Sequence, residues 1–279
     1  MTPFSSKGFH PFHLVSPSPW PLLTSLSVFF VVLGTLNFLV KGDSAFVALP
    51  LSGLFSLLLC VTQWWRDVVK EMLFLGTQSN SVLSSLNLGF SLFIVSEAVL
   101  FLSLFYCWVS MTLSPDTVYG LTYPPKGIIL TSITLIPFAN TVLLISSSLT
   151  ATIAHQYLSN NELSVTVANS KCMGMLLRTI GLGIIFLILQ FSEYNQSSMT
   201  MTDSTFGSLF YSITGLHGSH VLIGILFLSV NFWRMMGGHF TPSSHFGFVA
   251  SVWYWHFVDF IWLIVLALVY VWPAYQLLS

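Results

Sequence analysis

Charged residues are scarce in this chain. Only 6% of its 279 residues are charged, whereas 54% are hydrophobic, and the mean hydropathy is +0.83. Soluble domains carry about 25% charged residues, so this composition cannot cover a surface that faces water. A water-soluble globular enzyme is therefore excluded.

An excess of positive charge and paired cysteines are also lacking. Eight Lys and Arg residues against nine Asp and Glu give a formal net charge of -1, with no basic block that could neutralise a phosphate backbone. Nucleic acid is excluded as a partner. The three cysteines lie far apart and have no CxxC spacing, which excludes the common thiolate metal and redox motifs.

Long apolar runs are what the sequence has instead. Seven of them meet or approach the length of about 20 residues that a membrane-spanning helix needs. They cover Trp20–Val40, Ala45–Trp65, Val82–Leu113, Ile128–Tyr157, Leu163–Phe191, Thr205–Arg234 and Phe246–Trp272. Short turns rich in Gly, Pro, Asn and Ser separate the runs. The sequence thus predicts an all-α integral membrane protein with seven transmembrane helices and a single membrane domain over residues 1–279.

Two local patterns add detail to the predicted helices. Pro137 lies inside the fourth run and predicts a kink there. Small residues at helix-packing spacing, Ser208/Ser212 and Gly215/Ser219, predict that other helices approach the sixth closely.

Basic residues indicate the orientation. Successive loops lie on alternate sides of the membrane. The side that holds the N-terminus then has six basic residues, Lys7, Arg66, Lys70, Lys171, Arg178 and Arg234, and the other side has Lys41 and Lys126. The positive-inside rule then places the N-terminus in the cytoplasm or matrix and the C-terminus opposite.

Glu97 lies near the middle of the third run, where an isolated carboxylate costs at least a few kcal/mol. Two interpretations are open. The side chain is either a proton-exchanging or water-organising group, or a neutral structural carboxyl that bridges helices.

Two other pairs of polar residues lie within apolar runs. Asp259 follows His256 by three residues, which favours a buried polar clamp and leaves a proton relay as the alternative. His217 and His220 have the same spacing and could bind a metal or haem. Because His155 adds no paired spacing, we favour interhelical hydrogen bonds and expect no metal site.

The string QWWRDVVKE at residues 63–71 stands at the basic-side end of the second run. It is either an ordinary interfacial anchor or a lipid head-group site in which Arg66 and Lys70 meet a phosphate. Arg234 and His239, at the same membrane face, form a second candidate of this kind.

Several strings in order along the chain closely resemble cytochrome c oxidase subunit III. They are HPFHLVSPSPWPL at 10–22, QWWRDVVKE, LFIVSEAVLF at 92–101, FANTVLLISSSLTATIAHQ at 138–156 and, within 205–262, FGSLFYSITGLHGSHVLIG and HFTPSSHFGFVASVWYWHFVDFIW. The WYWHFVD part is highly specific, and the resemblance covers essentially the whole chain.

The resemblance implies a fold and a function. Helices 1–2, at about 20–65, would be separated from helices 3–7, at about 82–272, by a V-shaped cleft that holds phospholipids. The chain would be a non-redox subunit without a catalytic centre, packed against the catalytic subunit I and other oxidase subunits, which carry haem a and copper. The complex reduces oxygen with electrons from cytochrome c and pumps protons; this subunit would stabilise it and maintain proton uptake. The short chain and the low charge favour the mitochondrial inner membrane, with a bacterial cytoplasmic membrane as the alternative.

The resemblance also implies roles for single residues. Glu97 matches the family's carbodiimide-reactive membrane carboxyl. Positions around bound lipids are matched by Trp65, Arg66, Lys70, Glu71, Arg234 and His239. Polar interior positions are matched by His155, His217, His220, His256 and Asp259.

The chain departs from the family pattern at several points. The stretch after Glu71 lacks the usual histidines and basic residues, Gln156 stands where a second His is common, and Gly237 stands where Lys is common. Arg178 is an added charge in the fifth run, for which we expect snorkelling or pairing with an accessory subunit or lipid.

Two other functions compete with this one. An independent proton-coupled transporter or channel would use Glu97 and the face of His256 and Asp259, but the sequence shows no evident internal repeat. Subunit III of a related quinol oxidase is a further alternative, because other subunits build the site of electron entry.

Overall fold

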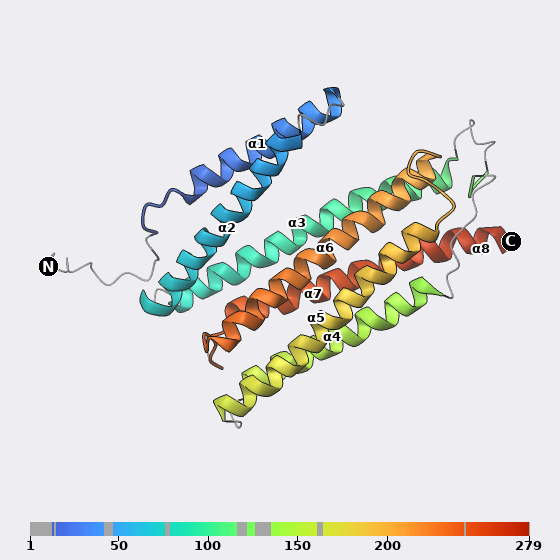
Figure 1. The fold of residues 1–279 in the computed structure, drawn as a ribbon. Helices are drawn as coiled ribbons and strands as arrows, with labels where there is room; N and C mark the ends of the chain where they lie inside the picture. Colours follow the sequence, from blue (N-terminus) through green and yellow to red (C-terminus); the bar gives the residue numbers. More distant parts are fainter. Residues whose placement is uncertain are drawn as a thin grey trace, which may run out of the picture. The chain divides into compact units, whose positions relative to one another are not determined.

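The computed structural model describes His13 and residues 15–41, 47–75, 79–115, 122–125, 135–160, 164–242 and 244–278. Seven spans in these ranges are long and apolar enough to cross a membrane, which confirms the predicted fold class (Figure 1). The helices are α1 (Trp20–Lys41), α2 (Ala48–Leu75), α3 (Asn80–Leu113), α4 (Ile136–Ser159), α5 (Val165–Gln196), α6 (Thr205–Met236) and α7 (Phe246–Val265), the last continued by η3 (Leu266–Val271) and α8 (Trp272–Leu278). Parts of the predicted helices at residues 45–46, 128–134 and 163, and the basic residues Lys7 and Lys126, lie outside the described residues.

The chain divides into two compact units, residues 1–86 and 87–279. In the first unit, α1 and α2 pack as an antiparallel pair. A Cβ atom at Gly34 would lie 2.5 Å from Cδ of Pro50, and the Ser56 hydroxyl donates to Ser27 Oγ at 3.0 Å. Small residues thus let the two backbones approach closely. The predicted lipid-filled cleft between the first two helices and the other five stays a prediction.

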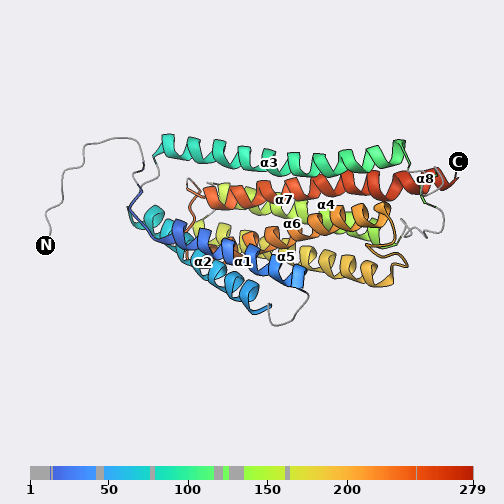
Figure 2. The same cartoon turned by 90° about the horizontal axis from the view of Figure 1, so that it is seen from above.

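The second unit packs α4, α5, α6 and α7 around a core of large buried side chains. In Figure 2, α3 and α5 lie on opposite sides of this unit, with α6 and α7 between them. Hydrogen bonds join neighbouring helices: Trp255 donates to Ser147 Oγ at 2.9 Å, and Tyr194 donates to Thr214 Oγ1 at 2.7 Å. In the absence of water, such bonds and close packing hold transmembrane helices together.

Two helices run well beyond their predicted ends. α2 continues through the QWWRDVVKE string to Leu75 instead of ending at Trp65, and α5 continues to Gln196 instead of ending at Phe191. The prediction treated loss of hydrophobicity as the end of the helix. A helix that leaves the bilayer keeps its backbone hydrogen bonds, however, and its exposed turns become polar.

The predicted kink at Pro137 is wrong. α4 begins at Ile136, which places Pro137 in the first turn, where a missing N–H breaks no helical hydrogen bond. A proline does perturb the last span. Pro273 follows the π-helical segment η3, whose wider turns relieve the clash of a proline ring with the carbonyl four residues earlier. Trp108 donates its indole N–H to the Leu268 carbonyl of this segment at 2.9 Å.

The predicted close-packing positions on α6 are also wrong in part. Gly215 and Ser219 are exposed, and a Cβ atom at Gly215 would meet no atom within 4 Å. The tight contact instead lies at Gly224, where a Cβ atom would come within 2.9 Å of Cε3 of Trp255. Spacing alone did not show which face of α6 meets α7.

We predict that Gly224→Ala destabilises the folded protein by about 1–3 kcal/mol, because the buried Trp255 ring has no space to move away. Gly215→Ala is the matched control and leaves stability unchanged or slightly raised, since alanine favours the helix. The measurement is the thermal midpoint of helix loss, by circular dichroism, for both variants purified in the same detergent. Equal midpoints for the two variants would contradict the prediction.

Candidate functional site

The intramembrane carboxyl Glu97 on α3 meets His220 on α6. Its Oε2 lies 2.7 Å from His220 Nε2, although the two residues are 123 positions apart in sequence. The side chain of Glu97 is 23% exposed and that of His220 is 8% exposed. Phe101 and Tyr254 flank the imidazole, with ring centroids at 5.0 and 6.3 Å. The surroundings of the pair are thus largely aromatic.

The backbone fixes one proton of His220. Its Nδ1 lies 2.8 Å from the Leu216 carbonyl oxygen, which only accepts, so Nδ1 carries a hydrogen. Two forms of the pair then fit the same geometry. Either a protonated Glu97 donates to the lone pair of Nε2, or an imidazolium donates to the carboxylate. Moving one proton over the 2.7 Å contact interconverts them.

His217, one turn before His220, has a different environment. Its Nε2 donates to the Val258 carbonyl oxygen of α7 at 3.1 Å, and its ring is packed between Phe186 and Trp262. The side chain is 1% exposed, and within the described part of the chain its Nδ1 has no hydrogen-bond partner. The spacing correctly placed His217 and His220 in helix contacts, but it did not show that they serve different neighbours.

Ser148 on α4 connects His256 and Asp259 on α7. Thr152 donates its hydroxyl to the Ser148 carbonyl at 3.0 Å, so its oxygen is the acceptor for His256 Nε2 at 3.2 Å. His256 Nδ1 lies 3.2 Å from Ser148 Oγ, which is also within hydrogen-bond reach of Asp259. The two residues therefore share a serine on a neighbouring helix as a partner.

His155 is not part of this group. It lies near the basic-side end of α4, with its ring 5.6 Å from that of His245 and 6.2 Å from that of Phe248. His245 donates from Nδ1 to the Thr241 carbonyl at 3.0 Å. His155 thus lies near the C-terminal end of the span Ile136–Ser159, and its assignment to the intramembrane polar residues stays a prediction.

In the first unit, carboxylates of α2 bind the first residue of α1 and the segment before it. Trp20 donates its indole N–H to Asp67 Oδ2 at 2.8 Å, Ser16 donates to Glu71 Oε1 at 3.1 Å, and His13 Nε2 lies 3.6 Å from Glu71 Oε2. Glu71, predicted at a lipid site, is thus engaged by this chain. Of the other predicted lipid contacts, Trp65, Arg66 and Lys70 are exposed on α2.

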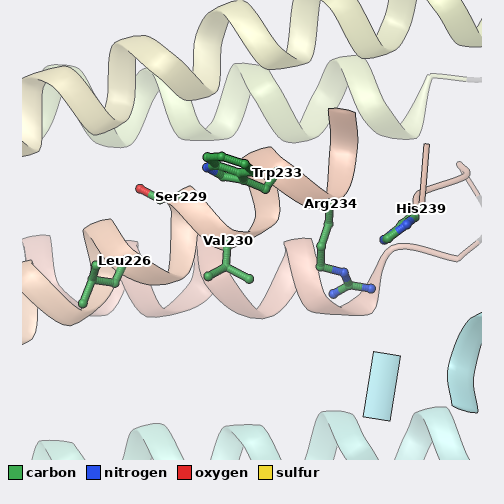
Figure 3. A pocket seen from close by; sticks show the side chains of 6 residues that line it. All are labelled: Leu226, Ser229, Val230, Trp233, Arg234 and His239. Carbon is green, nitrogen blue, oxygen red and sulfur yellow. The ribbon is translucent and has the colours of Figure 1, made fainter. Parts of the chain in front are cut away.

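Arg234 and His239 lie together at one end of a pocket of about 450 Å³ (Figure 3). Leu226, Ser229, Val230 and Trp233 complete its lining along α6. The Arg234 guanidinium stands 4.5 Å from the Phe240 ring centroid. Among the described residues, no carboxylate pairs with Arg234, and neither its Nε nor His239 Nδ1 has a partner. The pocket is apolar along its length and cationic at its end.

The structure also contains a buried polar cluster that the sequence did not reveal. Glu193 is 3% exposed in the last turn of α5, and Gln190 donates to its Oε2 at 3.3 Å. Asn140 of α4 donates to Gln190 Oε1 at 3.3 Å, and Tyr270 of η3 lies 3.5 Å from Gln190 Nε2. The predicted fifth run ends at Phe191, so hydrophobicity alone leaves Glu193 outside the helix. The QxxE spacing on one helical face was the available signal.

Comparison with known proteins decides the family. The family described as cytochrome c oxidase subunit III matches residues 10–274. This chain belongs to the cytochrome c oxidase subunit III family. Cytochrome c oxidase subunit 3 of Trichophyton rubrum is 42% identical over 265 residues, which cover 94% of this chain and 95% of that protein. The proteins of the same name from Myxine glutinosa and Drosophila yakuba are 40% and 41% identical over 96% of this chain, and 100% and 99% of their own lengths are covered.

Subunit III membership confirms the predicted assignment to a non-catalytic subunit of an oxidase. In the part of the chain that the structure describes, no group of three or more His, Cys, Asp or Glu side chains could hold a metal ion. The polar residues of this subunit III are instead paired between helices, as Glu97 with His220 and His256 with Ser148.

Proposed function

We propose that this chain is the core, non-redox subunit III of a mitochondrial cytochrome c oxidase. It supports oxygen reduction and proton pumping by subunit I, and haem a and copper belong to its partner subunits. It spans the inner membrane with the N-terminus in the matrix and the C-terminus in the intermembrane space. The observation that supports a role in proton chemistry, beyond family membership, is the Glu97–His220 contact of 2.7 Å within the membrane span.

The pair is suited to holding a proton without a large rearrangement. The Leu216 carbonyl holds a hydrogen on Nδ1 of His220. The shared proton therefore moves between two atoms only, Nε2 of His220 and Oε2 of Glu97. The imidazole packs against Phe101 and Tyr254 and is 8% exposed, and a hydrogen bond in such poorly hydrated surroundings is stronger than one in water. Such a pair exchanges protons slowly with the outside and buffers the local charge, which fits a subunit that sustains proton uptake over many turnovers.

The pocket of Arg234 and His239 is proposed as a phospholipid site. Acyl chains are compatible with Leu226 and Val230, and a phosphate oxygen suits a half-buried guanidinium at the end of a helix. Arg66 and Lys70, with Trp65 beside them, form the second proposed head-group site. His256 and Asp259 are proposed as a polar clamp between α4 and α7.

The assignment to the complex is tested on native membranes. Gentle detergent extraction and a native gel are expected to give a band in which peptides of this chain co-migrate with haem a absorbance and with peptides of subunit I. A haem-free band that contains this chain alone would reject the oxidase assignment and favour the transporter.

Glu97→Gln tests the role of the carboxyl. Glutamine keeps the size and can still donate to Nε2, so we expect normal assembly and an initial oxygen-consumption rate within about twofold of wild type. The number of turnovers before inactivation is expected to fall more strongly than the rate, because glutamine cannot exchange the proton.

Ser96→Ala is the control for Glu97→Gln. Its hydroxyl lies on the exposed side of α3 and donates to the Phe93 carbonyl only locally. Ser96→Ala should leave both rate and lifetime unchanged. Loss of the whole complex in Glu97→Gln would show instead that the carboxyl is structural.

Arg234→Gln tests the lipid site. Removal of the charge is expected to reduce the phospholipid phosphorus that stays with the purified complex after detergent washing, because a charge-assisted contact is lost. Lys171→Gln, which removes a cation that stands 5.5 Å from the Tyr157 ring and away from the pocket, is the control. Equal lipid retention in both variants would exclude a head-group at Arg234.

A further inference from the structure

Arg178 is an exposed arginine within the span of α5. The candidate span covers Thr166–Gln196, and Arg178 lies close to its middle. Its one polar contact among the described residues is weak, from Nη1 to the sulfur of Met175 at 3.7 Å. Charged residues at such positions usually face the interior of a bundle and are paired.

The depth of Arg178 follows from its own helix. Polar side chains bound the apolar part of α5 at Lys171 and Ser192, and the residues between them span about 30 Å, the thickness of a hydrocarbon core. Arg178 lies seven residues beyond Lys171, about 10 Å into that core. This distance exceeds the length of an arginine side chain, so snorkelling alone does not bring the charge to the head-groups.

The carboxylates that the structure describes are already engaged or lie elsewhere. Asp67 and Glu71 bind residues of the first unit, Glu97 binds His220, and Asp203 accepts from the Thr200 amide. Glu193 is buried with Gln190, and Asp259 faces Ser148. None of these described carboxylates pairs with Arg178.

The surface around Arg178 is shaped for a neighbouring helix. Gly174 and Gly181 lie one turn before it and one turn after it on the same side of α5, and a Cβ atom at either would meet nothing within 4 Å. Glycines at an open surface let another backbone approach closely. In Figure 2 this helix forms the side of the second unit opposite α3.

We infer that the α5 face of Gly174, Arg178 and Gly181 docks a transmembrane helix of another subunit, and that this helix carries an Asp or Glu at the depth of Arg178. Charge complementarity determines the occupant. A buried cation in hydrocarbon requires an anion at the same depth, and a head-group phosphate does not reach that depth. The two glycines allow the carboxylate-bearing backbone to come near enough for a direct ion pair.

The test compares subunit retention in the intact oxidase complex. Arg178→Leu, Arg178→Lys and wild-type complexes are purified, washed with increasing detergent, and each subunit is quantified per haem a by peptide mass spectrometry. Arg178→Leu is expected to lose one membrane-spanning subunit about five- to tenfold more readily, because an interhelical polar contact is removed. The lost subunit must contain an Asp or Glu inside its transmembrane helix, and Arg178→Lys retains it.

A second measurement addresses the partner's acid. Its replacement by Asn or Gln should reproduce the loss, and exchange of the two charges between the chains should restore binding. Ile185→Leu, two turns along the same exposed face, is the matched control and should retain every subunit.

Three results would overturn the inference. They are full retention in Arg178→Leu, loss of a subunit without an intramembrane acid, and loss of phospholipid phosphorus with all subunits retained. The last result would show that bilayer thinning brings Arg178 to a lipid head-group.

Discussion

A polar group inside a bilayer has no water to bind, so each must find its partner in the protein. The contact of Glu97 with His220 places a carboxyl and an imidazole together in an apolar span. It also connects α3 to the rest of its unit. Large side chains make the other links from α3: Phe101 packs on the ring of His220, and Trp108 reaches the Leu268 carbonyl. The Glu97–His220 hydrogen bond therefore both holds α3 against α6 and provides the site of the proposed proton chemistry.

Hydroxyl groups of α4 provide the hydrogen-bond partners for polar side chains of α7 inside the span. Ser147 accepts from Trp255, Thr141 accepts from Trp262, and Ser148 and Thr152 meet His256. The hydroxyls of Thr141, Ser147 and Thr152 also donate to carbonyl oxygens of α4 itself, which leaves their oxygen atoms free to accept from α7. The serines and threonines of α4 are thus the hydrogen-bond partners of indole and imidazole nitrogens of α7.

The sequence was sufficient for the number and location of the helices, since the length of an apolar run depends only on the thickness of the bilayer. It also placed Glu97, His217, His220 and Asp259 within membrane spans. Their pairing could not be predicted, because partners such as Glu97 and His220 are separated by 123 positions and no local pattern links them. Glu193 was missed for a related reason: hydrophobicity falls at the end of the bilayer, whereas a helix and its buried face continue.

Two arginines of this chain show how depth decides the partner of a charge. Arg234 stands in the last turn of α6, at the end of an apolar pocket that we propose as a phospholipid site. Arg178 lies near the middle of α5, without a pocket and beside two glycines that leave room for a backbone. A mobile phosphate suits the first position, since lipid exchange leaves the cation near water. The second position requires an anion that is carried into the hydrocarbon on a helix of its own, which ties Arg178 to assembly with other subunits.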